Sequence, residues 1–406
     1  MSSPHSASRR AGGYVQQPNG YRAFIPRPLP PSPPVDMAAL EPLLSEASIA
    51  VGRLDGSAST LLNPDLFVAM YVRREAVLSS QIEGTQSTLE DLLSYELDAN
   101  DSSTFKDVEE VVNYVAAMNF GLRRLTELPL SRRLIREIHG VLLRGVRGSE
   151  RSPGDFRTSQ NWIGAGNVPL ARATFVPPPV HEMQQALDDF ERFLNGERQL
   201  PALLHCGLAH AQFETIHPFL DGNGRVGRLL ITFLLVHRGV LTRPLLYLSH
   251  YLKANRAEYY DRLMAVRNDG DWEGWLRFFL LGVRETADEA SASIRAINTM
   301  REEHHARIRE QRGSPQASRL LDLLFRRPIV NIPVVRQELA ISSPTATRLI
   351  TLFESWGLLT EMTGAQRNRR YQYMPYLKLF DDEEVTRPSS PGEMPQSGDM
   401  DSTQHD

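Results

Sequence analysis

The chain has 406 residues, enough for two or three domains and at least one sizeable apolar core. Its formal net charge of −4 argues against attraction of the whole chain to nucleic acid or to an anionic membrane, although a local basic patch remains compatible with it. The only cysteine is Cys206, which excludes an intrachain disulfide and a cysteine-based zinc site.

The sequence shows neither a secretory signal nor a membrane span. The amino-terminal residues MSSPHSASRRAGG are polar and lack an apolar stretch. The longest apolar run, residues 229–236, is far shorter than the ~20 residues that a spanning helix needs. We therefore expect a cytoplasmic protein that makes no contact with membranes.

The two ends of the chain differ in composition from its centre. Residues 1–35 are rich in proline, serine and glycine, a composition that favours extended polyproline structure over packed elements. Residues 384–406 are polar and nearly free of large apolar side chains, so we expect a disordered tail.

Between these ends the apolar residues recur mostly at spacings of three and four, which predicts helices. The predicted helical ranges are 38–53, 63–82, 86–98, 105–126, 130–146, 181–195, 200–215, 223–238, 255–267 and 272–308. Residues 157–179 interrupt the pattern with glycines and a proline triplet. Short β-prone pieces flank the glycines, so a β-hairpin flap is predicted there.

A second kind of unit begins after about residue 312. Residues 313–380 contain three helical pieces followed by a predicted strand, a basic turn and another strand, which is the winged helix-turn-helix plan. The arginines of this unit favour a nucleic-acid contact and a protein-docking role equally; they are Arg348 on the third helix and Arg367, Arg369 and Arg370 in the turn.

The run HPFLDGNGRVGR, residues 217–228, concentrates polar groups in a short space. Gly222, Asn223 and Gly224 precede a helix, where several backbone N–H groups can converge on one anion. Arg225 and Arg228 lie three residues apart on that helix, and two guanidinium groups beside such a turn suit a polyphosphate. Asp221 suits Mg²⁺ and His217 suits proton removal, so the combination predicts phosphate chemistry.

Simpler interpretations explain each feature but not the combination. A histidine before proline is usually structural, and a Gly-Asn-Gly turn is usually only a turn. The lysine of a Walker A loop is absent, and a zinc site of His205, His210 and His217 fails because helical positions five apart diverge. Phe219 is the apolar residue expected to pin the loop to the core.

The run matches the motif HxFx[DE]GNGRxxR of the Fic (filamentation induced by cAMP) domain family at every defined position. The resemblance extends over roughly residues 20–310. It implies a mainly α fold: an amino-terminal helical region at 36–110, a helical Fic catalytic domain with the flap at 111–312, and the winged helix behind it. The implied activity is transfer of AMP from ATP to a serine, threonine or tyrosine hydroxyl of a target protein or of the chain itself.

The resemblance also implies roles for single residues. His217 would be the general base, Asp221 would hold Mg²⁺ or Mn²⁺, and residues 222–224 would bind the α- and β-phosphates. Arg225 would stabilise charge along the phosphates, and Arg228 would receive the γ-phosphate. For the adenine the candidates are Tyr251 and Asn255, in the segment after the motif.

An upstream segment, SSQIEG at residues 79–84, places Ser79 and Glu83 four residues apart on one helix face, just before Gly84. Alone, this is typical of a solvated helix end. Beside the Fic motif it resembles the inhibitory helix motif [ST]xxxE[GN]. A Glu83–Arg228 pair would deny Arg228 to the γ-phosphate, which implies autoinhibition.

Two alternatives stay open from the sequence. One is a DNA-binding regulator with a degenerate Fic domain, and the other is a Fic enzyme that removes AMP or transfers another phosphate-containing group. The target protein cannot be identified from the sequence, and neither can the oligomeric state, for which a homodimer on an apolar helical surface is one option.

Overall fold

The computed structural model describes residues 10–59, 61, 64–97, 107–164, 169–197, 199–311 and 313–380. The tail predicted to be disordered, 384–406, lies outside these residues. In chain order the helices of the main body are α2 Met37–Ala58, α3 Pro64–Ile82, α4 Leu89–Leu97, α5 Val108–Arg124, α6 Arg132–Leu142, α7 Val180–Asn195, α8 Ala202–Ile216, α9 Asn223–His237, α10 Ser249–Ala254, α11 Arg256–Asp269 and α12 Trp272–Glu310. The expected mainly α fold is confirmed.

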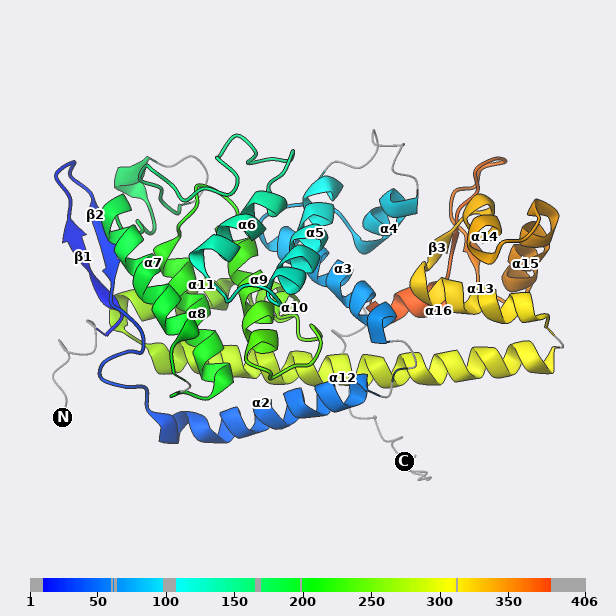
Figure 1. Cartoon of the computed structure of the whole chain (residues 1–406), viewed down its shortest axis with the longest axis horizontal. Helices are drawn as coiled ribbons and strands as arrows, with labels where there is room; N and C mark the ends of the chain where they lie inside the picture. The colour runs from blue at the N-terminus through cyan, green and yellow to red at the C-terminus, as the bar shows by residue number, and fades with distance from the viewer. Residues whose placement is uncertain are drawn as a thin grey trace, which may run out of the picture.

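Helix α12 runs along the length of the molecule, and α2 packs beside it (Figure 1). The buried residues of α2 include Leu40, Ala47, Val51 and Leu54, whose spacings of seven, four and three place them on one face. Asp36 caps the start of α2 by accepting a hydrogen bond from the backbone N–H of Ala39. None of the described helices combines the length and apolar content needed to span a bilayer.

Helices α8 and α9 form the centre of the body. Every residue of α8 from Leu203 to Ile216 is buried, and most of α9 is buried as well. Helices that are apolar all round can be satisfied only inside a protein. The loop between them, residues 217–222, is therefore held by two fixed helix ends.

The amino-terminal lead contains a packed element, contrary to the prediction for residues 1–35. Strands β1 Gly12–Gln16 and β2 Arg22–Pro26 form an antiparallel hairpin. Its backbone is tied to the body by a 2.9 Å hydrogen bond from Phe24 N to Val176 O, and the Phe24 ring is fully buried. Burial of this aromatic residue outweighs the proline-rich composition that flanks it.

The flap predicted at 157–179 is smaller than a regular hairpin. Its described residues are joined by a single antiparallel bridge, Ile163 with Phe175, and by the 3-10 turn η1 at Leu170–Arg172. Residues 165–168, where the predicted turn lies, are outside the described ranges.

Residues 313–380, called the C-terminal unit below, contain the predicted three helices and two strands in the predicted order, together with β3, α16 and η2, which were not predicted. Its elements are α13 Pro315–Arg326, β3 Ile329–Val330, α14 Ile332–Leu339, α15 Ser343–Ser355, β4 Thr360–Glu361, β5 Tyr371–Gln372, α16 Met374–Leu377 and the 3-10 turn η2 Lys378–Phe380. The three strands pair antiparallel in the order β3-β5-β4. The assignment of this unit as a winged helix-turn-helix stays a prediction.

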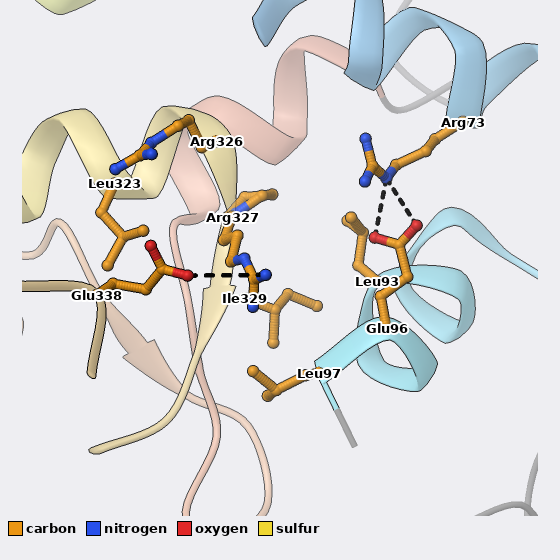
Figure 2. Close-up of a pocket in the computed structure, with 10 residues that line it drawn as sticks. Arg73, Leu93, Glu96, Leu97, Leu323, Arg326, Arg327, Ile329 and Glu338 are labelled. Atoms are coloured by element: carbon orange, nitrogen blue, oxygen red, sulfur yellow. Dashed lines mark hydrogen bonds and ion pairs between the residues drawn. The ribbon is translucent and has the colours of Figure 1, made fainter. Parts of the chain in front are cut away.

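The C-terminal unit meets the body at α3 and α4 (Figure 2). A cavity of about 440 Å³ lies at the junction, between Arg73 and Glu96 on one side and Arg327 and Glu338 on the other. On each side of the cavity the two charged residues form an ion pair, at 2.9 Å for Arg73–Glu96 and 3.7 Å for Arg327–Glu338. The unit therefore rests against the same helix, α3, that leads to Glu83.

Candidate functional site

The loop between α8 and α9 is closed by short-range contacts. His217 ends α8 in the left-handed conformation, with φ 48°. Phe219 is fully buried and stacks on the ring of His139 at 3.7 Å, as expected of the residue that pins the loop. The Asn223 side chain accepts a hydrogen bond from Phe219 N at 2.9 Å and donates one to Phe219 O at 2.8 Å. These contacts fix the loop at both ends.

The start of α9 forms an anion-binding turn. Gly222 precedes the helix with φ 76°, a conformation that glycine adopts without strain. The first i to i−4 hydrogen bond runs from Val226 N to Gly222 O, so the N–H groups of Asn223, Gly224 and Arg225 precede that ladder. With the helix dipole behind them, these N–H groups attract negative charge.

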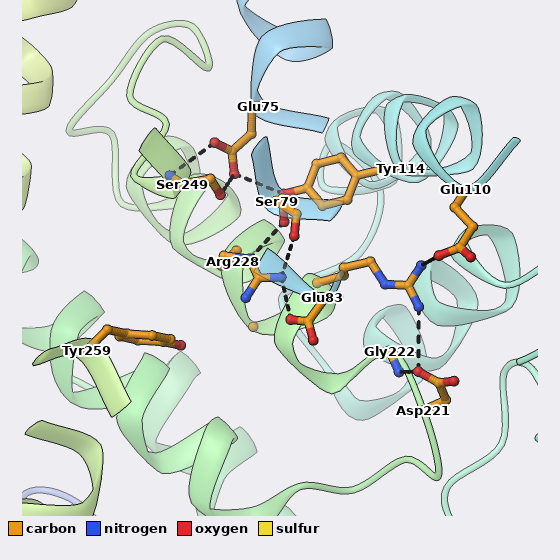
Figure 3. Close-up of polar contacts among 12 residues, drawn as sticks. Glu75, Ser79, Glu83, Glu110, Tyr114, Asp221, Gly222, Arg228, Ser249 and Tyr259 are labelled. Atoms are coloured by element: carbon orange, nitrogen blue, oxygen red, sulfur yellow. Dashed lines mark hydrogen bonds and ion pairs between the residues drawn. The ribbon is translucent and has the colours of Figure 1, made fainter. Parts of the chain in front are cut away.

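Glu83 and Ser79 hold Arg228 beside this turn (Figure 3). Arg228 Nε donates to Ser79 Oγ at 2.7 Å, and one terminal nitrogen donates to Ser79 O at 3.0 Å and to Glu83 Oε1 at 2.7 Å. Gly84 follows with φ 100°, which turns the chain directly after Glu83. The structure thus brings the segment 79–84 and the end of the Fic-like motif into direct contact.

The Glu83 carboxylate lies over the anion-binding turn itself. A Cβ atom added to Gly224 would come within 2.2 Å of Glu83 Oε1. Burial opposes ionisation of Glu83, but the charge of Arg228, the hydrogen bond from Arg228 and the charge of Arg225 outweigh it and lower the pKa of Glu83. An ionised carboxylate is therefore the anion that this turn accommodates in the described state.

Helix α3 is anchored two turns upstream by Glu75, which sequence reasoning missed. Its carboxylate accepts hydrogen bonds from the Tyr114 hydroxyl at 3.1 Å and from the Ser249 hydroxyl at 2.6 Å. Burial raises the pKa of Glu75 to about 7. Glu75, Ser79 and Glu83 are four residues apart and form one polar stripe of α3 that faces the core.

Arg225 has a different partner from the one expected. Its side chain is 1% exposed and donates to Glu110 Oε2 at 2.8 Å, while a second nitrogen lies 3.5 Å from Asp221 Oδ1. Arg225 therefore links a buried carboxylate of α5 to the carboxylate of the loop. No motif pointed to Glu110, because it lies 115 residues from Arg225 in the sequence.

His217 is surrounded by positive charge and backbone contacts. Its carbonyl oxygen accepts hydrogen bonds from Arg157 Nε at 3.1 Å and from Asn161 Nδ2 at 3.2 Å. Burial, together with the charges of Arg267 and Arg157, lowers the pKa of His217 to about 3. The imidazole is therefore neutral at physiological pH. Arg157 and Asn161 belong to the predicted flap, but nothing in the sequence assigned them to His217.

Asp221 suits a cation that takes most of its ligands from groups other than protein side chains. Its side chain is 38% exposed, and Oδ1 accepts a hydrogen bond from Gly222 N at 2.5 Å. No group of three or more histidine, cysteine, aspartate or glutamate side chains suited to a metal occurs in the described part of the chain. A single carboxylate beside an anion-binding turn suits Mg²⁺ whose other ligands are phosphate oxygens and water.

The two adenine candidates are engaged in contacts with neighbouring residues. Tyr251 is 8% exposed and packs against Phe278, at 5.1 Å between ring centroids, and against Gly282 of α12. The Asn255 side chain donates a hydrogen bond from Nδ2 to the Tyr251 carbonyl oxygen at 3.0 Å. Tyr260, one helical turn beyond Asn255, is 41% exposed, and the charges of Glu83 and Arg228 act on its hydroxyl.

Comparisons with known proteins agree with this geometry. The family model "Fic/DOC family N-terminal" matches residues 42–123, and the model "Fic/DOC family" matches residues 129–235. The first match extends past residue 110, where the sequence suggested a domain boundary.

Among curated proteins, the chain is 30% identical over 193 residues to the protein adenylyltransferase Fic of Drosophila grimshawi, and 29% identical to that of Drosophila melanogaster. Each match covers 47% of this chain and 36% of the relative. The chain therefore spans about a third of the length of the curated relatives it matches.

Among solved structures, a Fic family protein from Desulfovibrio desulfuricans G20 has a TM-score of 0.56 at 21% identity, covering 84% of this chain and 97% of that chain. This likeness concerns the fold. With a Fic N-terminal region before a Fic domain that contains the 217–228 loop, the chain is a Fic domain protein.

Proposed function

We propose that this chain is a protein adenylyltransferase that moves AMP from ATP to a serine, threonine or tyrosine hydroxyl of a target protein or of itself, and that Glu83 inhibits it. The observation that carries the proposal is the Glu83 carboxylate, which lies over the N-terminus of α9 and pairs with Arg228 at 2.7 Å. A site that holds a carboxylate in this way is built for a phosphate of similar charge and size.

In the proposed reaction the hydroxyl oxygen attacks the α-phosphorus, and the bond from that phosphorus to the bridging oxygen of pyrophosphate breaks. Neutral His217 Nε2 takes the hydroxyl proton, and pyrophosphate leaves with the bonding electrons. The N–H groups of Asn223 to Arg225 bind the phosphates, and Arg228 binds the γ-phosphate once Glu83 has moved away. Arg157 and Asn161 keep His217 in position through its carbonyl oxygen.

Asp221 would hold Mg²⁺ or Mn²⁺, which supplies positive charge to the phosphates when bound. Arg225 contributes indirectly, since its pair with Glu110 keeps its guanidinium beside Asp221. For the adenine, Tyr260 joins Tyr251 and Asn255 as a candidate, because its ring is exposed and the charges of Glu83 and Arg228 act on its hydroxyl.

Incubation of the Glu83→Gln chain with ATP labelled either at the α- or at the γ-phosphorus tests the reaction. Label retained on protein from the α position alone, with loss of retention in Glu83→Gln/His217→Ala, supports AMP transfer. Retention from the γ position would identify phosphoryl transfer instead, and release of AMP from a modified target would identify the reverse, AMP-removing activity. No retained label at all would favour a regulator with a degenerate site.

A further inference from the structure

The C-terminal unit differs in charge from the rest of the protein. Residues 313–380 contain nine arginine and lysine residues and four carboxylates, a net charge of +5, whereas the whole chain carries −4. The rest of the chain therefore carries a net negative charge, so the excess of positive charge belongs to the C-terminal unit itself. A basic domain on an acidic protein indicates a local anionic partner.

Surface arginines of the body are largely paired with carboxylates. Examples are Arg53 with Asp288, Arg132 with Asp188, Arg243 with Asp65, Arg262 with Glu258 and Arg284 with Glu46. In the C-terminal unit, Arg348, Arg367 and Arg369 make no ion pair with any described residue. Arg348 contacts only the Thr345 hydroxyl, at 3.4 Å, and Arg369 donates to the Ala365 carbonyl at 2.8 Å. Their charges are available to an external partner.

Helix α15 presents a face of short side chains beside Arg348. Ala346, Leu349, Ile350 and Phe353 are buried and fix its inner face. The exposed residues in its first part are small or hydroxyl-bearing, with one cation: Ser343, Pro344, Thr347, Arg348 and Thr351. The carboxylate of α15, Glu354, is half-buried near the end of the helix, so the N-terminal part of the outer face is the part that can approach a polyanion. Short hydroxyl side chains also permit contact with base edges in a groove.

The helix before α15 and the loop after it border the surface through which a partner would reach α15. Helix α14 ends at Ala340, whose φ of 53° turns the chain into Ser342, the cap of α15. Beyond α15, residues 362–370 connect β4 to β5, and Met362 N donates to Arg370 O at 3.0 Å. Arg367 and Arg369 are exposed on this loop, called the basic loop below. The whole unit lies at the end of the molecule opposite β1 and β2 (Figure 1).

We propose that the C-terminal unit binds double-stranded DNA, with α15 in the major groove and the basic loop on the neighbouring phosphate backbone. A helix preceded by a short helix and a tight turn is the geometry that enters the major groove in helix-turn-helix proteins. Arg348 and the hydroxyl residues of α15 contact bases, and Arg367 and Arg369 contact phosphates. This interaction is separate from nucleotide transfer and survives if that proposal fails.

The proposal gives a quantitative salt dependence. Each neutralised phosphate releases counterions, so the phosphate contacts of Arg367 and Arg369 contribute about −2 to the slope of log affinity against log salt concentration. Removal of the two loop arginines lowers that slope by about 2, because each contact contributes roughly −0.9.

The test measures binding of the full chain to a fluorescein-labelled 30-bp duplex of random sequence, by fluorescence anisotropy at several salt concentrations between 50 and 200 mM. The loop variant is Arg367→Glu/Arg369→Glu. A matched control, Arg53→Glu/Arg192→Glu, changes the net charge equally but on exposed arginines of the body. Melting temperatures verify folding, and Arg367→Gln/Arg369→Gln replaces the loop variant if that variant is unstable.

The expected result is salt-dependent binding by the parent and the body control, and at least tenfold weaker binding with a shallower slope in the loop variant. AMP transfer, where measured, is unchanged in both. The proposal is overturned if the parent does not bind at 50 mM salt, or if the loop and body variants weaken binding equally. In the first case the unit is a protein-docking module, and in the second the attraction is unspecific.

Discussion

The 217–228 loop and the C-terminal unit both carry arginines suited to phosphate, but they hold them in opposite ways. In the loop, Arg225 and Arg228 are buried and each faces a carboxylate, Glu110 and Glu83. In the C-terminal unit, Arg348, Arg367 and Arg369 are exposed and form no ion pair with a described residue. One region is a closed site that already contains an anion, whereas the other is an open surface.

Buried and exposed arginines bind phosphate under different electrostatic conditions. A buried guanidinium must be paired, because an unpaired buried charge is costly, so a phosphate can enter the loop only by replacing a carboxylate. An exposed arginine is solvated by water and needs no partner, and salt weakens any ion pair that it forms. Changes at the loop should therefore alter chemistry by large factors, and changes at the surface should alter salt-dependent binding.

The largest effect is expected for His217→Ala. In the Glu83→Gln background, AMP transfer should fall by about 10²–10⁴-fold, because the hydroxyl proton loses its acceptor. The fold should remain, since the imidazole Nδ1 makes no hydrogen bond within the described residues. Measurement with α-labelled ATP, beside the exposed-histidine control His181→Ala, checks this. Transfer close to that of the background chain would remove His217 from the reaction.

A smaller effect is expected for Asp221→Asn, which retains an oxygen for the Gly222 N–H group but loses the charge. The Mg²⁺ concentration that half-saturates AMP transfer should rise on the order of tenfold, because cation affinity follows the charge of the ligands. Glu109→Gln, on the exposed side of α5, serves as the control. An unchanged Mg²⁺ titration would mean that another group holds the cation.

The smallest effect concerns stability and a buried carboxyl that the reaction does not use. Glu214 is 6% exposed, its Oε1 has no hydrogen-bond partner among the described residues, and burial raises its pKa to about 7. A raised carboxyl pKa favours the neutral form in the folded state. Its contribution is complete below the pKa of the unfolded chain, near 4.5, and is lost as pH rises to about 7.

The Glu214→Gln chain lacks this titration. Between pH 5 and pH 7.5 the free energy of unfolding of the parent should therefore fall by about 2 kcal/mol more than that of the variant. Denaturant titrations at a series of pH values measure the difference. Equal pH dependence in the two chains would show that Glu214 is ionised in the folded protein.

Much of the body was predictable from the sequence, because its helices and turns follow from patterns of neighbouring residues. The helical spacings and the turn at Gly222 depend on residues close together in the chain. The contact of Glu83 with Arg228 was also anticipated, because two motifs with defined positions fix both partners. The order of elements in the C-terminal unit follows from the same local signals.

Partners that lie far apart in sequence and belong to no motif could not be predicted. Glu110 reaches Arg225 from α5, and Arg157 reaches the His217 carbonyl from the flap. The hairpin β1–β2 was missed because Phe24 is buried by a distant strand edge, which composition does not reveal. The packing of Tyr251 against Gly282 of α12 was likewise not predictable, because the two residues belong to different helices.

The central claim is that Glu83 keeps Arg228 from the γ-phosphate, and the most direct test compares AMP incorporation from α-labelled ATP by the parent, Glu83→Gln and Glu83→Gly. Glutamine keeps the helix and removes only the charge, whereas glycine also weakens the last turn of α3 by about 1 kcal/mol.

We predict a gain of between about tenfold and 10²-fold in both variants, because the freed arginine aligns the α-phosphorus with the attacking hydroxyl. Addition of Arg228→Ala should erase this gain, and Glu109→Gln should match the parent. Unchanged or lower incorporation in both Glu83 variants would contradict the account.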